Sequence, residues 1–214
     1  MKLVKPSFQI LSIMHDNYDG RSLSLIELAG RTCYKSEDKI TNDSAKQFVQ
    51  KLNKLGHHSV IEHSAMTIKF IVDRGVSHEL VRHRLCAFSQ ESTRYCNYKG
   101  GVTFIIPPWV DIEEGEYSFA SPHCDKDIYI EHLLNCEFTY QTLLLNSWSP
   151  QQARSVLPNS LKTEIVVTTN FREWQHIFKL RTSKAAHPQM REIMIPTLEV
   201  VKKFVPIIFN DIEY

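Results

Sequence analysis

The fourteen residues from Arg82 to Tyr95 read RHRLCAFSQESTRY and gather a dense set of polar side chains. They include three arginines, a histidine, a glutamine and four hydroxyl side chains. Arginine presents a planar set of N–H donors that matches phosphate and carboxylate oxygens, and hydroxyls and amides add neutral donors and acceptors. Such a cluster suits a ligand that carries several phosphates and a flat polar ring. The alternative is a solvated surface helix followed by a strand, with the arginines paired to acidic side chains.

The pattern within this stretch resembles the signature of the flavin-dependent thymidylate synthases. That signature runs Arg-His-Arg, then three residues of which the last is usually serine, then a polar loop and Ser-x-Arg-Tyr. Ala87 departs from it, because serine is usual at that position, whereas the loop residues 89–91 are one of its polar variants. Six residues match it at the same spacing: Arg82, His83, Arg84, Ser92, Arg94 and Tyr95.

The composition is that of an ordinary globular protein. With 214 residues, of which 43% are hydrophobic and 23% charged, the chain fits one domain spanning residues 1–214. The net charge of +1 argues against a nucleic-acid-binding protein, which more often carries a strong basic excess. No apolar run of about 18 residues is present, so we expect no membrane-spanning segment. The five cysteines form no CxxC pair, which favours free thiols and a cytoplasmic location.

The residues before and within the signature predict two helices and a strand. Residues 42–55 have apolar side chains at helical spacing, and Gly56 can end that helix in a left-handed conformation. Residues 65–72 alternate apolar and polar side chains, which is typical of a strand. Ser77 is a good cap for a short helix over residues 78–84, on which Glu79, Arg82 and His83 would share one side. Residues 85–92 would then form a loop.

The second half of the chain predicts another strand and several helices. Residues 163–169, TEIVVTT, favour a strand, and Asn170 can cap a helix that follows it directly. A long helix is expected over residues 125–148. A terminal helix over residues 192–208 would be broken or kinked at its two prolines. Together these elements predict the α+β class, with a central mixed or antiparallel sheet and helices packed on it.

The resemblance implies an FAD site assembled from several segments. Residues 57–63, HHSVIEH, match a family segment of the form His-x-Ser/Thr-x-x-Glu-His. The arginines and histidine of the signature, and polar positions around the helix after Asn170, match further flavin contacts of the family. The FAD-binding residues implied in this way are His57, Ser59, Glu62, Arg82, His83, Arg84, Gln90, Asn170, Arg172, His176 and His187.

Residues 57–63 also allow a zinc site. His57, His58, Glu62 and His63 are ordinary zinc ligand types. However, HExxH is absent, and the spacing from His58 to Glu62 is one residue too long for HxxEH. We therefore predict no metal, and keep a zinc hydrolase as an alternative.

The resemblance further implies a dUMP site. Arg154 lies in the pattern Ala-Arg-x-x-Leu-Pro, which the family carries at a second nucleotide-binding arginine. The family often has glutamine where Glu79 stands and glutamate where Gln90 stands, so those two contacts depart from its pattern. The dUMP-binding residues implied are Glu79, Arg82, Gln90, Ser92, Thr93, Arg94, Arg154 and Arg181.

The implied reaction is the reductive methylation of dUMP to dTMP by an FAD-dependent methyltransferase. In it, 5,10-methylenetetrahydrofolate donates the carbon and NADPH-reduced FAD donates the hydride. Arg181 is the main catalytic candidate, because a fixed guanidinium aimed at the uracil ring stabilises the negative charge that develops there. Ser92 is assigned to positioning and activating the substrate, since no histidine is an evident base for it. Cys86 falls at a free position of the signature, so no cysteine nucleophile is expected.

The resemblance also implies a homotetramer with active sites between subunits. Its partners would be dUMP, folate and NADPH, with no nucleic acid and no membrane. A single-stranded nucleic-acid-binding protein that stacks bases on residues such as Arg94, Tyr95 and Tyr98 is the remaining alternative.

Overall fold

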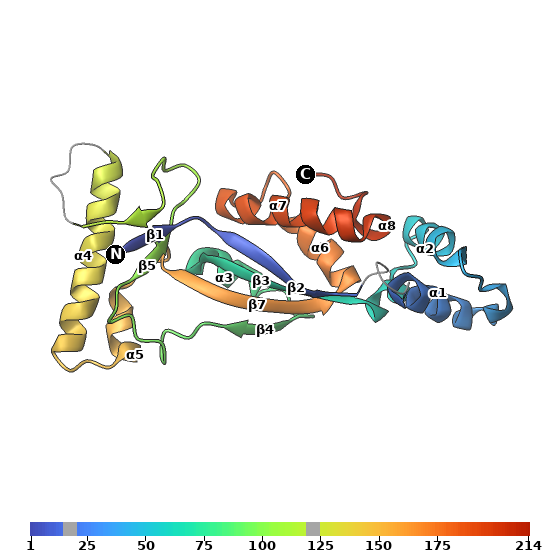
Figure 1. Ribbon diagram of the computed structural model, residues 1–214, viewed down its shortest axis with the longest axis horizontal. Helices are drawn as coiled ribbons and strands as arrows, with labels where there is room; N and C mark the ends of the chain where they lie inside the picture. The colour runs from blue at the N-terminus through green and yellow to red at the C-terminus, as the bar shows by residue number, and fades with distance from the viewer. Residues whose placement is uncertain (15–20, 119–124) are drawn as a thin grey trace. The chain divides into compact units, whose positions relative to one another are not determined.

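A computed structural model of the chain describes residues 1–14, 21–118 and 125–214. Figure 1 shows helices together with open sheets, which confirms the predicted α+β class. Contacts divide the chain into two compact units, each built from separated segments. The first unit comprises Met1–Ser7, Phe70–Arg82 and Ser89–Ile165, and the second comprises Phe8–Lys69, His83–Phe88 and Val166–Tyr214. The assignment of residues 1–214 to a single domain stays a prediction.

The strands of the described residues form two sheets. The three-stranded sheet has the order β5-β1-β6, and its strand β1 runs parallel to β5 and antiparallel to β6, so this sheet is mixed. Its strands are β1 (Lys2–Val4), β5 (Thr103–Ile105) and β6 (Gly115–Glu116). The four-stranded sheet has the order β2-β3-β7-β4. Its strands are β2 (Ser7–Ile13), β3 (Ala65–Asp73), β7 (Lys162–Asn170) and β4 (Ala87–Gln90).

The long strands β3 and β7 confirm the strands predicted at residues 65–72 and 163–169. Side chains alternate between buried and half-buried along both strands, as expected when the two faces of a sheet differ in exposure. The prediction of a loop over residues 85–92 is wrong for residues 87–90, which form β4. Four residues are too few for alternation to identify a strand, and β4 depends instead on its neighbour β7 in the sheet.

Helix α3 (Arg74–Leu80) begins three residues before the predicted cap Ser77. Its cap is Asp73, the last residue of β3, whose Oδ1 accepts a hydrogen bond from the Val76 backbone N at 2.8 Å. The helix also ends early, so Arg82 and His83 lie beyond it. The prediction that Glu79, Arg82 and His83 share one side of a helix is therefore wrong.

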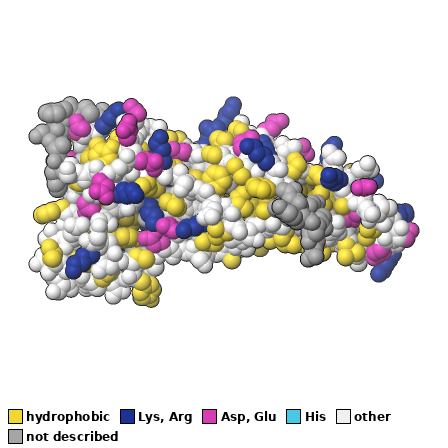
Figure 2. Space-filling view, viewed as in Figure 1, with side chains coloured by type: hydrophobic (Ala, Val, Ile, Leu, Met, Phe, Trp, Pro, Cys, Tyr) yellow, Lys and Arg dark blue, Asp and Glu magenta, His cyan; other side chains and the backbone are white. Residues whose placement is uncertain are grey.

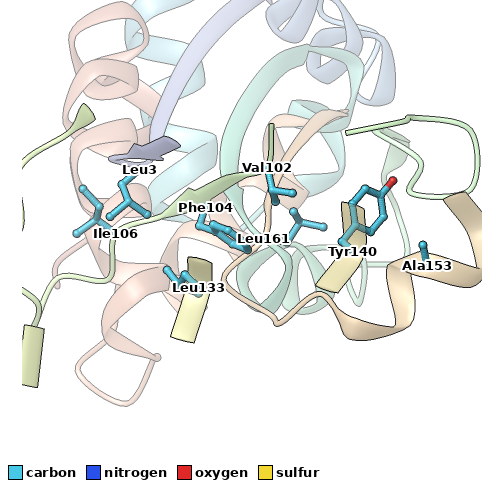
Figure 3. Packing of buried hydrophobic residues seen from close by; sticks show 8 residues of the cluster. All are labelled: Leu3, Val102, Phe104, Ile106, Leu133, Tyr140, Ala153 and Leu161. Atoms are coloured by element: carbon cyan, nitrogen blue, oxygen red, sulfur yellow. The ribbon is translucent and has the colours of Figure 1, made fainter. Parts of the chain in front are cut away.

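The core of the first unit includes one side of the long helix α4 (Asp125–Leu145). Figure 3 shows Phe104 beside Leu161, and the two residues also form an isolated β-bridge. Helix α5 (Pro150–Ala153) and the 3-10 helix η3 (Arg154–Val156) pack against α4. The buried cluster consists of Leu3, Val102, Phe104, Ile106, Leu133, Tyr140, Ala153 and Leu161.

The second unit is mainly helical. Helix α1 (Arg21–Cys33) packs against α2 (Ser44–Lys54), and α6 (Phe171–Arg181) packs against α7 (Pro188–Phe204). Trp174 and Phe178 of α6 are fully buried and stack with ring centroids 5.4 Å apart. The shorter elements are η1 (Glu37–Lys39), η2 (His58–His63) and α8 (Pro206–Phe209).

The predicted terminal helix differs from the structure at its start and is not broken at Pro196, whereas the predicted break at Pro206 is confirmed. Helix α7 begins at Pro188 rather than Glu192 and continues through Pro196. The chain leaves helical geometry at Val205, and Pro206 then occupies the first turn of α8, where its missing N–H costs nothing.

No helix among the described residues is long and apolar enough to cross a bilayer.

The core cluster gives the first prediction. Leu133→Ala should lower the free energy of unfolding by about 2–5 kcal/mol, because Leu133 is 1% exposed and the truncation leaves a cavity. Leu28→Ala, on α1, is the matched control because Leu28 is 46% exposed, and should change it by less than about 0.5 kcal/mol. Urea denaturation measures both. Equal losses would contradict the assignment of Leu133 to the core.

Candidate functional site

A cavity of about 450 Å³ in the second unit is lined by the end of α1, the segment after α2 and the start of α6. Small-molecule sites commonly enclose roughly 300–1,000 Å³. Three predicted site residues, His57, Ser59 and Arg172, share this cavity. We call it the His57 pocket, and its lining residues are Gly30, Cys33, Tyr34, Leu52, Gly56, His57, His58, Ser59, Val60 and Arg172.

Gly56 turns the chain into the pocket. It adopts φ 75°, in the left-handed region that favours glycine, just beyond the end of α2 at Lys54. This confirms the predicted role of Gly56. The 3-10 helix η2 follows at once, so His57 and Ser59 lie on a tight turn rather than on an extended segment.

An ion pair lies at the pocket wall. Arg172 Nη1 bonds to Glu62 Oε1, and the two side chains are 54% and 42% exposed. An ion pair this exposed contributes about 1 kcal/mol or less. Arg172 can therefore exchange Glu62 for an anionic ligand at little cost.

The start of α6 is held by three hydrogen bonds. Asn170, the predicted cap, accepts from Glu173 N through its side-chain oxygen at 2.9 Å. Phe171 N donates to Ser64 O at 2.8 Å, and Trp174 Nε1 donates to Met66 O at 3.0 Å. These bonds fix where the helix begins and hence where its polar side chains lie.

A buried histidine joins the two ends of α6. Arg181 Nε donates to His83 Nε2 at 3.1 Å, and Glu173 Oε1 lies 3.5 Å from His83 Nδ1. The ring of His176 stands edge-on to the His83 ring, with centroids 5.7 Å apart. We call His83, Glu173, His176 and Arg181 the His83 cluster. It brings three predicted site residues together with Glu173, which the sequence did not indicate.

The environment of His83 keeps its imidazole neutral. Burial, the Arg181 guanidinium and His176 together lower the pKa of His83 from 6.5 to about 4, with burial the largest cause. Because Arg181 must be the donor, His83 Nε2 is the nitrogen without a hydrogen, and the ring carries its proton on Nδ1.

The same cluster contains the one group of three potential metal ligands found among the described residues. One ligand atom from each of His83, Glu173 and His176 lies within 4.8 Å of the others. Residues 57–63 form no such group in the part of the chain that is described. The zinc site considered for those residues therefore has no support from their geometry.

In the first unit, the signature loop (residues 90–96) lies beside Arg154. Arg154 Nη1 donates to Thr93 Oγ1 at 3.0 Å across 61 residues of sequence. Ser92 Oγ accepts from Arg94 N at 3.3 Å, and Cys96 N donates to Ser92 O at 2.8 Å, so the loop is a compact turn. The exposed Arg94 and Arg154 and the hydroxyl of Ser92 thus belong to one part of the surface.

Partly buried polar contacts anchor this loop. Glu91 Oε1 accepts from the Tyr98 hydroxyl at 2.8 Å, and Glu91 Oε2 pairs with Lys162 Nζ at 3.0 Å. Burial and the bond to Glu91 raise the pKa of Tyr98, which keeps its hydroxyl protonated as a donor. Gln90 Nε2 donates to Ser77 Oγ and Thr163 Oγ1, at 2.9 and 3.2 Å. The Gln90 amide N–H groups therefore serve the loop itself.

The remaining predicted residues occupy varied positions. Glu79 is half-buried in the last turn of α3, and Arg82 and Arg84 are exposed. His187 is the exposed cap residue of α7, where its Nδ1 accepts from Gln189 N at 3.4 Å. The predicted dUMP and FAD residues are divided between the two units, and Glu79, Arg82, Arg84 and His187 lie outside the groupings described above.

Sequence reasoning missed some of the pocket residues and Glu173. Gly30 and Cys33 reach the pocket from α1, and Tyr34 from the turn after it. Residues 29–34 resemble an Ala-x-Arg-x-Cys-Tyr segment of the same family, which was the available signal. Arg31 in that segment is structural, since it bonds Glu27 through Nε and Nη2 at 3.1 and 2.9 Å. Nothing local in the sequence marks Glu173.

Surface charge does not favour the nucleic-acid alternative. Figure 2 shows Lys and Arg side chains interspersed with Asp and Glu on the visible face, rather than gathered in one basic patch. Single-stranded nucleic-acid sites normally combine aromatic side chains with a continuous positive groove. The net charge of +1 agrees with this mixed surface.

Comparison with known proteins matches nearly the whole chain. The family described as "Thymidylate synthase complementing protein" matches residues 17–207. A flavin-dependent thymidylate synthase of Geobacter sulfurreducens is 33% identical over 194 residues, covering 87% of this chain and 80% of the relative. A flavin-dependent thymidylate synthase of Mycobacterium marinum is 32% identical over 199 residues, covering 89% of this chain and 79% of the relative.

Solved structures show the same fold. A UMP/dUMP methylase, PolB from Streptomyces cacaoi, bound with 5-Br dUMP, superposes with a TM-score of 0.77 at 24% identity, covering 98% of this chain and 96% of its own. Thymidylate synthase X (ThyX) from Helicobacter pylori, with FAD and dUMP, has a TM-score of 0.74 at 19% identity, covering 96% of this chain and 98% of the ThyX chain. At these identities the likeness is one of fold.

The pKa of His83 predicts a pH-dependent stability. The pKa of His83 is lower in the folded protein than in the unfolded chain. The contribution of neutral His83 to the free energy of unfolding is therefore fully present above pH 6.5, the pKa in the unfolded chain, and is lost as the pH falls towards 4. His83 should account for a loss of about 2 kcal/mol between pH 7 and pH 5. Urea denaturation of the wild type and of His83→Gln at both pH values measures it. An equal pH dependence in the two proteins would contradict the lowered pKa.

Proposed function

The chain belongs to the flavin-dependent thymidylate synthase family, and on that premise we propose that it binds FAD and dUMP and forms dTMP by reductive methylation. The proposed carbon donor is 5,10-methylenetetrahydrofolate, and the proposed reductant of the flavin is NADPH. The structural observation that carries the proposal is the approach of Arg154 to the signature loop, because it supplies a second guanidinium for a phosphate group.

In this proposal the first unit binds the nucleotide phosphate. Arg94 and Arg154 provide charge-assisted hydrogen bonds to its oxygens, and the Ser92 hydroxyl adds a neutral donor. The contact between Arg154 and Thr93 holds the arginine in place before the ligand arrives, which reduces the entropy lost on binding. Glu79, Arg82 and Gln90 are the further proposed dUMP residues, and the bonds from Gln90 to Ser77 and Thr163 suggest that it supports the loop.

Arg181 is the proposed catalytic residue. Its guanidinium would stabilise negative charge on the uracil oxygens and nitrogen as the ring carbon becomes nucleophilic. Arginine suits this task because it does not lose its own proton. Ser92 is proposed to position and activate dUMP rather than to attack it. Burial raises the pKa of the Cys86 thiol, which disfavours the thiolate form, and this supports a reaction without a cysteine nucleophile.

The His57 pocket is the proposed contact point for part of the flavin. Its donors, the imidazoles of His57 and His58, the Ser59 hydroxyl and the Arg172 guanidinium, fit an anionic and hydrogen-bonding ligand, and its volume admits one part of a dinucleotide. When bound and reduced, FAD supplies the hydride of the reaction. The further proposed FAD residues are Glu62, Arg82, His83, Arg84, Gln90, Asn170, His176 and His187.

We also propose a homotetramer with active sites between subunits, located in the cytoplasm. Phe138 and Leu145 of α4 support an interface, since they are 61% and 79% exposed and lie seven residues apart, on one side of the helix. Cys33, Cys86, Cys96 and Cys136 are free thiols, which fits a reducing compartment.

The proposed roles of Arg181 and Ser92 predict different losses of activity. Arg181→Ala should lower kcat for dUMP by roughly a hundredfold or more, because one preorganised charge donor is removed. Ser92→Ala should keep measurable turnover. Steady-state formation of dTMP, at matched flavin content, checks both variants. Complete loss in both would instead assign Ser92 a covalent or proton-transfer role.

The flavin proposal predicts a binding loss at the His57 pocket. The purified protein should be yellow, and Arg172→Ala should weaken FAD roughly tenfold or more, since a charge-assisted hydrogen bond is lost. Lys179→Ala is the matched control, an exposed cation on the same helix outside the pocket. Spectrophotometric titration with FAD measures the dissociation constants. Equal weakening in both variants would mean that Arg172 acts only through general charge.

A further inference from the structure

We propose that Glu173 is a positioning residue, which acts through His83 to hold the Arg181 guanidinium in one orientation. The inference extends the proposed function, because it rests on Arg181 as the group that acts on the nucleotide. It assigns a purpose to a carboxylate that is not among the predicted ligand-binding residues.

The contact between His83 and Arg181 determines which imidazole nitrogen carries the proton. Arginine has donors and no acceptor, so the 3.1 Å bond from Arg181 Nε requires a lone pair on His83 Nε2. A neutral ring then has its hydrogen on Nδ1. Glu173 Oε1 lies 3.5 Å from that nitrogen, and an ionised carboxylate is an acceptor only.

Both contacts favour the same tautomer. In the other tautomer, Nε2–H would oppose the N–H of Arg181, while the Nδ1 lone pair would face the carboxylate. Each of these contacts is repulsive. Glu173 and Arg181 therefore favour the same imidazole tautomer. As in other carboxylate–histidine pairs, the carboxylate orients the ring, and the ring in turn orients the Arg181 guanidinium.

Packing strengthens the arrangement. His83 is 5% exposed, so its contacts operate at a lower effective dielectric than those of surface groups. The edge-on ring of His176 lies against the His83 ring and limits its rotation. The backbone of Glu173 is held in place, because its N–H donates to the capping side chain of Asn170.

The same geometry disfavours a metal in this cluster. A metal on His83 Nδ1 would move the ring proton to Nε2, where it would meet the N–H of Arg181. The guanidinium would also repel the cation at close range. The close approach of His83, Glu173 and His176 is therefore better explained by the His83–Glu173 polar contact and the His83–His176 ring contact than by metal ligation.

Three variants of the full-length protein test the inference. Glu173→Ala removes the acceptor, and Glu173→Gln keeps an acceptor oxygen without the charge. Glu199→Ala is the matched control, since Glu199 is also a helix carboxylate and pairs with Lys202 on the surface. NMR of protein labelled with 15N at histidine and arginine reports the His83 tautomer and the water exchange of the Arg181 Nε–H, with His83→Gln to assign the signal.

In the wild type we expect the hydrogen on His83 Nδ1 and slow exchange at Arg181 Nε. Glu173→Ala should give a mixture of tautomers and faster exchange, with kcat for dUMP lowered by up to roughly a hundredfold, as for a misplaced catalytic group. Glu173→Gln should recover the tautomer and most of kcat, whereas Glu199→Ala should match the wild type. Recovery by the isosteric amide separates orientation from a loss of folding.

Several results would overturn the inference. They are a wild-type hydrogen on Nε2, unchanged NMR signals and kcat in Glu173→Ala, equal kinetic losses in the alanine and glutamine variants, or stoichiometric zinc in purified protein that His176→Ala abolishes. The NMR signals decide the matter even if the protein makes no dTMP. In that case the proposed function is wrong, and the NMR signals still decide whether Glu173 positions Arg181 through His83.

Discussion

The junction between β7 and α6 is the constraint on which the candidate site of the second unit depends. The strand runs directly into the helix, and Asn170 turns its side chain back to accept from Glu173 N. Because the first residue of α6 is fixed, the 3.6-residue period of the helix fixes the directions of the side chains that follow. Arg172 then lines the His57 pocket, while Glu173, His176 and Arg181 gather around His83. A cap of this kind typically contributes about 1 kcal/mol, and here it also sets the geometry of the site.

The same device appears where β3 runs into α3. Asp73 and Asn170 have nearly the same backbone angles, φ −75° and ψ 167° against φ −76° and ψ 167°, and each caps through its side-chain oxygen. The helix over residues 74–80 is therefore set by the last residue of the strand, and Ser77, an equally good capping residue type, lies inside it. Local cap preference predicted the right kind of element at the wrong position, because it ignored where the strand ends.

The parts of the structure that sequence could predict are those with local causes. Alternation identified β3, β-propensity identified β7, glycine chemistry identified the turn at Gly56, and cap chemistry identified Asn170. Strand β4 is too short to show a period, and its pairing with β7 involves residues distant in sequence. For the site, the signature supplied the residue types through resemblance. It could not supply the partners, since the contact between Arg181 and His83 spans 98 residues and that between Arg154 and Thr93 spans 61.

The interleaving of the two units has a consequence for how the protein is made. The chain passes from one unit to the other after Ser7, Lys69, Arg82, Phe88 and Ile165. Each unit consists of segments that are synthesised at different times. The first unit is complete only after Ser89–Ile165 has been synthesised, and the second only after Val166–Tyr214. Early segments with apolar faces, α2 among them, are then exposed for longer than in a protein whose domains follow one another in sequence. We therefore expect folding to depend on chaperones and on the rate of translation, and no single truncation point among the described segments separates one unit from the other.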